Sequence, residues 1–259
     1  MKIAKLAIVV LFVAASMLAS QPARATTCTI ESFQGVYGIN TVGVGLDTSG
    51  NPVTSIYQVT ADGKGKVTGL ETKDFDGSNA MTTLSGTYTI NPNCTGTTVF
   101  KNENGQTEHY RLVLNDSNNG AFLFQTDSGT VQTAVAVAQG TIATCSDTTM
   151  ARTYSFELSG VIPGGRQVAF AGQLVLKEKE VSGGETGSIT GSLDLSNDGI
   201  ITPSSVTGRY SVNSNCTATM SITFSGANTI DLILVLVDGG AKALAIDIDD
   251  DAITGWLQE

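Results

Sequence analysis

The densest group of potential metal ligands lies near the end of the chain, where four aspartates fall within five positions: Asp247, Asp249, Asp250 and Asp251. Carboxylate oxygens are the ligands that Ca²⁺ prefers, and calcium outside cells is concentrated enough to fill weak sites. No EF-hand spacing surrounds them, and residues 246–249 alternate isoleucine with aspartate, as a half-buried strand does. We expect the isoleucines to face the core and the carboxylates to lie in water, with a Ca²⁺ site as the less favoured alternative.

Few residues could supply acid–base or nucleophilic chemistry. His109 is the only histidine, so a Ser-His-Asp or Cys-His arrangement could use no other imidazole base. Two carboxylate pairs could face one another across a cleft as acid and base: Glu71 with Asp74, and Glu178 with Glu180. The sequence contains no GxSxG, HExxH or P-loop pattern. Because acidic residues are common on solvated surfaces, we expect surface positions for the four carboxylates. We expect a surface or edge-strand position for His109, and no enzymatic activity.

The elements that position these residues occur in two copies. Two segments recur with the same offset of 122 residues: GKVTG at 65–69 as GSITG at 187–191, and GTYTINPNCTGT at 86–97 as GRYSVNSNCTAT at 208–219. Self-similarity at one fixed spacing indicates a duplicated structural unit. We therefore predict two β-rich domains, residues 26–140 and 141–259.

Four cysteines allow three disulfide pairings: Cys28, Cys94, Cys145 and Cys216. The repeat favours Cys28–Cys94 with Cys145–Cys216, because this pairing closes within each copy and lets each copy fold alone. Each bridge would close a loop of about 65–70 residues and contribute about 4 kcal/mol in the chain-entropy description. A zinc thiolate site is the weaker alternative, since no CxxC occurs and the chain has one histidine.

The first 25 residues have the pattern of a secretory signal peptide. A basic start precedes the apolar run from Leu6 to Leu18, and Ala23-Arg24-Ala25 is a small-x-small cleavage pattern. We therefore expect a secreted or periplasmic protein without a membrane span. A lipid anchor on Cys28 is less favoured, because the residues before it lack the Leu-small-small pattern of a lipoprotein.

The charge of the chain excludes a class of partners. The formal charge is -10, and removing the three basic residues of 1–25 leaves 11 basic and 24 acidic residues, a charge of -13. Nucleic acids and anionic membrane surfaces are bound by Lys and Arg contacts. We expect no nucleic-acid partner, and solubility outside the cell accounts for the acidity.

Short runs of β-branched and aromatic residues, separated by Gly, Asn, Asp and Ser, predict eight strands in each copy. The first copy has them at 35–45, 53–60, 65–73, 82–91, 95–101, 107–114, 120–126 and 131–138. The second has them at 152–161, 167–178, 185–195, 204–213, 217–224, 229–237, 241–248 and 252–258. Eight hairpin-linked antiparallel strands favour a closed barrel, which has no exposed edges, over the alternative of a two-sheet sandwich.

The repeated segments resemble those of poorly characterised secreted bacterial proteins, in which a GKVTG hairpin precedes a strand pair of the type GTYTxNPNCTGT. More distantly, the Gly35-Val36-Tyr37 opening and the eight strands resemble calycin-type barrels, including the lipocalin and allene oxide cyclase–dirigent groups. The resemblance implies a tandem of barrels and assigns no functional residue. Trp256, the single tryptophan, lies in the last strand and not in the opening one, which argues against a true lipocalin.

Three functions fit such a tandem. In the first, a barrel binds a small apolar or amphipathic molecule in its interior or mouth. In the second, the barrels are packed solid and the protein is a structural or interaction protein of the cell exterior. The third, an enzyme similar to allene oxide cyclases or dirigent proteins, requires a polar cluster inside a barrel, and Tyr88 and Tyr210 at equivalent positions are better interpreted as core residues. We favour ligand binding.

Overall fold

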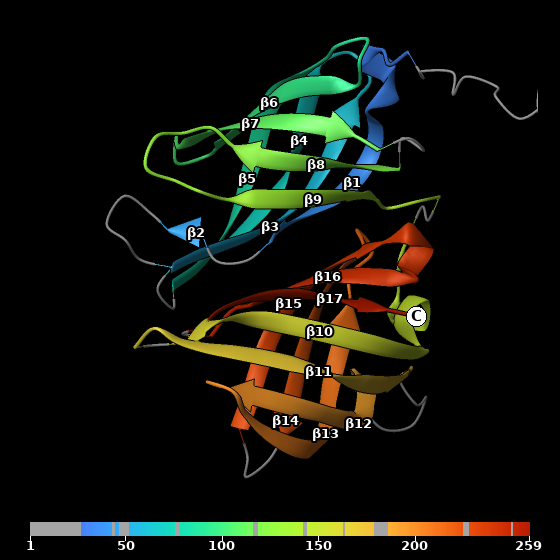
Figure 1. Cartoon of the computed structure of the whole chain (residues 1–259). Coiled ribbons are helices and arrows are strands. Elements are labelled where there is room, and N and C mark those ends of the chain that lie inside the picture. The colour runs from blue at the N-terminus through green and yellow to red at the C-terminus, as the bar shows by residue number, and fades with distance from the viewer. Residues whose placement is uncertain are drawn as a thin grey trace, which may run out of the picture.

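The computed structural model describes residues 27–42, 45–46, 52–75, 78–115, 119–141, 144–162, 164–178, 186–224, 228–249 and 251–259. The predicted signal peptide lies outside these residues. The chain forms two closed eight-stranded antiparallel barrels, one after the other (Figure 1). This result confirms the barrel prediction and excludes the sandwich alternative. No helix in the described part of the chain is long and apolar enough to cross a membrane.

The first barrel closes where its first strand pairs with both its second long strand and its last strand. Its strands are β1 (Gln34–Val42), β3 (Pro52–Asp62), β4 (Lys66–Phe75), β5 (Ser78–Ile90), β6 (Thr95–Asn102), β7 (Thr107–Leu114), β8 (Gly120–Gln125) and β9 (Thr133–Ala138). β1 pairs with β3 and with β9, and each other strand pairs with its neighbours along the chain. A two-residue strand, β2 (Gly45–Leu46), pairs with the start of β3.

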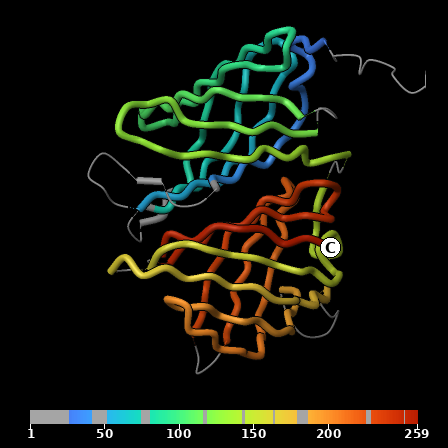
Figure 2. The backbone as a smooth tube through the Cα atoms, viewed as in Figure 1, coloured from blue at the N-terminus to red at the C-terminus, as the bar shows by residue number. Residues whose placement is uncertain are grey.

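The second barrel repeats this meander. Its strands are β10 (Thr153–Ile162), β11 (Arg166–Lys177), β12 (Gly187–Asn197), β13 (Ile200–Val212), β14 (Thr217–Phe224), β15 (Asn228–Val237), β16 (Lys242–Asp247) and β17 (Ala252–Gln258). β10 pairs with β17 and closes the wall. The backbone trace shows the two barrels next to each other, with the first in blue to green and the second in yellow to red (Figure 2). Alternating side chains point inward along each strand, so that each barrel has its own apolar core.

One end of each barrel is closed by a short helix and a disulfide. The helices are η1 (Ile30–Ser32) and α2 (Asp147–Met150). The bridges are Cys28–Cys94 and Cys145–Cys216, the pairing that the repeat favours. Disulfides of this kind persist in oxidising compartments, as expected for a secreted or periplasmic protein.

The outer faces of the two barrels pack against each other through a third apolar core. Ile56 of β3 lies in this core with four residues of β15 and β16: Val235, Val237, Leu244 and Ile246. Gly38 of β1 allows the close approach, because a Cβ atom there would lie 2.6 Å from a methyl carbon of Val237. This contact buries the outer face of several strands whose inner face already lines a barrel.

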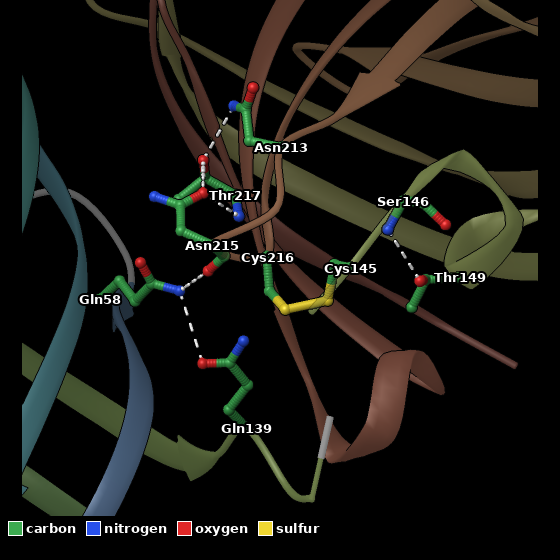
Figure 3. The surroundings of a disulfide bond; sticks show 9 residues. All are labelled: Gln58, Gln139, Cys145, Ser146, Thr149, Asn213, Asn215, Cys216 and Thr217. Atoms are coloured by element: carbon green, nitrogen blue, oxygen red, sulfur yellow. Dashed lines mark hydrogen bonds between the residues drawn. A yellow bond between two sulfur atoms is a disulfide. The ribbon is translucent and has the colours of Figure 1, made fainter. Parts of the chain in front are cut away.

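Hydrogen bonds accompany the apolar contact. The Asn40 side chain donates to the Gly255 carbonyl oxygen at 2.9 Å, and the Thr254 hydroxyl donates to the Thr41 carbonyl oxygen at 3.1 Å. Beside the Cys145–Cys216 bridge, the Gln58 amide of the first barrel donates to the Asn215 carbonyl of the second (Figure 3). The two barrels therefore share a mixed apolar and polar interface.

This interface overturns the expected orientation of the isoleucine–aspartate segment. Ile246 lies in the core between the barrels, and Asp247 is fully buried instead of lying in water. Alternation along β16 places Asp247 on the face of Ala243 and Ala245, which line the second barrel. The pattern of one buried and one solvated face fails here because both faces of β16 are covered.

Each of the two predicted domains should fold without the other. Residues 26–140 and 141–259, expressed separately in an oxidising compartment, should each fold, because each contains a closed barrel with its own core and disulfide. Each half should melt cooperatively but at a lower temperature than the whole chain, since separation exposes the third core to water. Circular dichroism melts of both halves and the full protein would test this. A half that stays unfolded would contradict the domain boundaries.

Candidate binding site in the first barrel

A group of polar side chains lies inside the first barrel, near the end opposite to the disulfide. We call it the mouth cluster, and it consists of Tyr57, Glu71, Lys73, Glu108 and Tyr110. These residues lie on β3, β4 and β7, in the same alternation phase as core residues deeper in the barrel, such as Val59, Val67 and Leu112. β3 and β7 lie across the barrel from each other, so the cluster spans the barrel interior.

Glu108 is the centre of the hydrogen-bond network. Its Oε2 accepts hydrogen bonds from the Tyr57 hydroxyl at 2.8 Å and the Tyr110 hydroxyl at 3.1 Å. Its Oε1 accepts from Lys73 Nζ at 2.7 Å. The two tyrosine oxygens are 3.1 Å apart. The Glu108 carboxylate is thus paired with a cation and with two hydroxyl donors, which stabilises it inside the barrel.

The surroundings of Glu71 differ from those of Glu108. It is 4% exposed, and its Oε1 has no hydrogen-bond partner among the described residues. Burial raises the pKa of Glu71 to about 7, and the charge of Glu108 adds to the shift, while Lys73 opposes it. The fully buried Ser55 hydroxyl, on the adjacent strand, also has no partner among the described residues.

The tyrosines remain hydrogen-bond donors at neutral pH. Burial raises the pKa values of Tyr57 and Tyr110 well above their ordinary range, and the charge of Glu108 raises both further. Their rings flank Phe100, with centroid distances of 5.5 Å and 5.6 Å. The site therefore combines an aromatic wall with fixed donors and acceptors.

The second barrel has aliphatic residues in place of four of the five residues of the mouth cluster, and Gly172 in place of Tyr57. At the 122-residue offset, Glu71, Lys73, Glu108 and Tyr110 correspond to Leu193, Leu195, Ile230 and Leu232. The strand register also matches Ser55, which lies opposite Lys73, to Phe170, which lies opposite Leu195. Leu193, Ile230, Leu232 and Phe170 are buried core residues of the second barrel. The two barrels therefore have the same strand arrangement but differ in the side chains that fill the interior near one end.

Sequence analysis singled out Glu71 alone among these residues, and paired it with Asp74. The two do not face one another, because residues three apart in a strand lie on opposite faces. The expected surface positions are wrong for both, since Glu71 and Asp74 are buried on the inner and outer faces of β4. Tyr57, Lys73, Glu108 and Tyr110 were missed. A signal for three of them existed in the repeat, since Lys73, Glu108 and Tyr110 have aliphatic counterparts in the second copy. In the other suggested pair, Glu178 accepts a hydrogen bond from Thr148 at 2.9 Å, and Glu180 lies outside the described residues.

His109 lies on the outer face of β7. Its Nδ1 is 2.7 Å from Asp127 Oδ1, and its backbone N–H donates to Asp127 Oδ2 at 2.8 Å. In the second copy, the Asp231 N–H donates to Asp249 Oδ2 at 3.0 Å. Asp127 and Asp249 are 122 residues apart, so each copy uses an aspartate to bind the backbone of the equivalent strand, β7 in the first barrel and β15 in the second.

Two of the aspartates near the chain end, Asp247 and Asp249, accept hydrogen bonds from nearby backbone N–H groups. Asp247 Oδ1 accepts a hydrogen bond from the Asp249 N–H at 2.9 Å. Burial raises the pKa of Asp247 to about 8, and nearby carboxylates, including Asp249, Asp251 and Asp74, contribute. Among the described residues, which omit Asp250, no three side chains of metal-binding type lie close enough to hold an ion.

Two hollows lined by described residues lie outside the mouth cluster. One, of about 310 Å³, borders the seam between the barrels and is lined by residues that include Phe122, Val135, Val137 and Asp238. The other, of about 490 Å³, is an open depression over β11, β12 and β13. Neither brings together a charged cluster like that of the first barrel.

Comparison with known proteins assigns the chain to no family. No family model matches the chain, and no curated protein matches it. Among solved structures, the chain is similar to a redesigned β-barrel, mFAP1, bound to DFHBI. That similarity has a TM-score of 0.34 at 17% sequence identity and covers 44% of this chain and 97% of the designed one.

Proposed function

We propose that the first barrel binds a small amphipathic molecule at the mouth cluster, and that the second barrel is a packed support. The protein acts in this proposal as a secreted or periplasmic binding protein and not as an enzyme. The ligand places its apolar part against the aromatic wall of Tyr57, Phe100 and Tyr110, and its polar end against the carboxylates.

One observation carries this proposal: the polar cluster occurs in one copy of a duplicated barrel, and its two carboxylates, its lysine and Tyr110 have aliphatic counterparts in the other copy. Folding does not require the cluster, because the second barrel closes with leucine and isoleucine at those positions. Burying charged groups costs free energy that apolar residues of similar size do not cost. A polar group retained in spite of that cost is typical of a binding site.

The hydrogen bonds support binding more than catalysis. Glu108 already accepts from three donors, and the raised pKa values of Tyr57 and Tyr110 remove both hydroxyls from the range of a general base. Glu71 is the remaining group of the cluster with a pKa near neutrality. Its side-chain hydrogen bonds are to Asn102 and Thr82, which lower its pKa, and the histidine that would complete a nucleophile–base arrangement lies on the outer face of β7.

A second candidate function is favoured by a separate observation on the outside of the first barrel. Val113, Phe122 and Phe124 are 44%, 62% and 46% exposed on β7 and β8, and Val113 lies directly opposite Phe122 in the ladder. Large exposed apolar side chains in a group are typical of interaction surfaces. This surface supports the alternative of an interaction protein of the cell exterior.

Filling the mouth should abolish binding. Ser55→Phe places in the first barrel the residue that the second barrel has at the matching position. We expect wild-type protein to bind one molecule of a neutral amphipathic probe, N-phenyl-1-naphthylamine, per chain, and the Ser55→Phe variant to bind none, by fluorescence titration. The matched control, Phe170→Leu in the second barrel, should bind as wild type does. Binding of two molecules per chain, or undiminished binding by a folded Ser55→Phe variant, would move the site elsewhere.

A further inference from the structure

The charges of the mouth cluster do not balance. Two carboxylates, Glu71 and Glu108, share the barrel interior with one ammonium, that of Lys73. Lys73 lies 2.7 Å from Glu108, so its charge is already matched. With both carboxylates ionised, the cluster has one negative charge more than its cations neutralise. A buried charge without a counter-charge is costly unless the group is protonated or a cation is bound.

The hydrogen bonds show the same asymmetry. Both oxygens of Glu108 have donors. Glu71 is hydrogen-bonded to the side chains of Asn102 and Thr82, but its buried Oε1 has no donor among the described residues. A ligand that donates a charge-assisted hydrogen bond would give Glu71 Oε1 the partner that it lacks among the described residues. The Ser55 hydroxyl, which has no partner among the described residues either, offers a second polar contact on the neighbouring strand.

The surroundings of Glu71 also favour a cation. Tyr57 lies directly opposite Glu71 in the ladder between β3 and β4, and its ring belongs to the aromatic wall with Phe100 and Tyr110. Aromatic faces attract cations through their quadrupole. The chain has a formal charge of -10, which increases the local concentration of positively charged ligands.

We infer that the ligand of the first barrel is a monovalent cationic amphiphile, a protonated amine on an apolar body, whose ammonium group binds Glu71. This inference rests on the proposed function and specifies its ligand class. The ammonium supplies the missing counter-charge and the missing donor, and the apolar body lies along the aromatic wall.

Calorimetric titration of the full mature protein with three probes of equal chain length separates the alternatives: octylammonium, octanol and octanoate. At pH 7.5, octylammonium should bind about tenfold more tightly than octanol, and octanoate least, because a charge-assisted hydrogen bond is stronger than a neutral one. Equal affinities for octylammonium and octanol would overturn the cationic assignment and leave ligand binding intact. Binding of none of the three, together with no binding of the naphthylamine probe, would overturn both proposals.

Two variants locate the effect. Glu71→Gln keeps the shape of the side chain and removes its charge, so it should weaken octylammonium about tenfold and leave octanol unchanged. Asp247→Asn removes a buried carboxyl from the second barrel and should change neither affinity. Equal losses in both variants would show that the ammonium group responds to overall charge and not to Glu71.

The pH dependence of wild-type binding is a readout that requires no variant. The titratable groups that face Glu71 are Lys73 of its own strand, Tyr57 of β3, and Glu108 and Tyr110 of β7. Because the pKa of Glu71 is about 7, its charge develops as the pH rises through neutrality. Octylammonium affinity should therefore increase from pH 5.5 to pH 8.5, while octanol affinity should not. A flat octylammonium profile would contradict an ionic contact with Glu71.

Discussion

At pH 8.5 the Asp247→Asn variant should have a free energy of unfolding larger than that of the wild type, by a difference on the order of 5 kcal/mol. The pKa of Asp247 is raised from 3.8 to about 8, because the carboxyl is fully buried beside other carboxylates. A folded protein with such a group binds a proton that the unfolded chain has released. Its stability therefore falls as the pH rises from about 4 to about 8, and asparagine removes this loss.

Denaturant unfolding at several pH values would measure the effect. Asn retains the oxygen that accepts the hydrogen bond from the Asp249 N–H, so the difference between variant and wild type should shrink toward zero near pH 4. Asp194→Asn, at an exposed position of β12, is the matched control and should change the stability by less than about 0.5 kcal/mol at any pH. A wild type as stable at pH 8.5 as at pH 5 would show that Asp247 is ionised at little cost.

Removal of the Cys145–Cys216 bridge should destabilise the second barrel by about 4 kcal/mol. The bridge joins residues 71 positions apart, and closing so long a loop restricts the unfolded chain. Because both cysteines belong to one barrel, the Cys145→Ala, Cys216→Ala double variant should lose the second barrel first. Trp256, on β17, reports this unfolding by its fluorescence, and the six tyrosines of the chain report on both barrels.

The backbone at Cys216 provides a control. Its φ is +67°, a conformation that costs a residue with a Cβ atom more than glycine. Cys145→Ala with Cys216→Gly should therefore be more stable than the double alanine variant by about 1 kcal/mol. Cys94 has the same conformation, with a φ of +64°, so the first barrel should behave alike. Simultaneous loss of both barrels on removal of one bridge would show that the third core makes the tandem a single cooperative unit.

The barrel architecture could be predicted from the sequence, because each strand has its own local pattern and the whole set of strands occurs twice. Two-residue alternation and turn residues mark strands one at a time, and the strands at 107–114, 217–224 and 252–258 have the predicted bounds. The 122-residue repeat then favours one cysteine pairing over two others, without any knowledge of distances. Eight hairpin-linked strands without protected edges favour closure.

Only the tertiary structure decided where the polar residues meet. Tyr57 and Glu108 are 51 residues apart and contact each other because the wall closes and brings β3 and β7 to opposite sides of one interior. Nothing in either strand specifies that contact. In the same way, the outer surface of β16 is buried because the first barrel lies against it, which makes Ile246 inaccessible, while Asp247 is inaccessible on the inner face of the same strand. Alternation shows that a strand has two faces, but what covers each face depends on packing between segments distant in the chain.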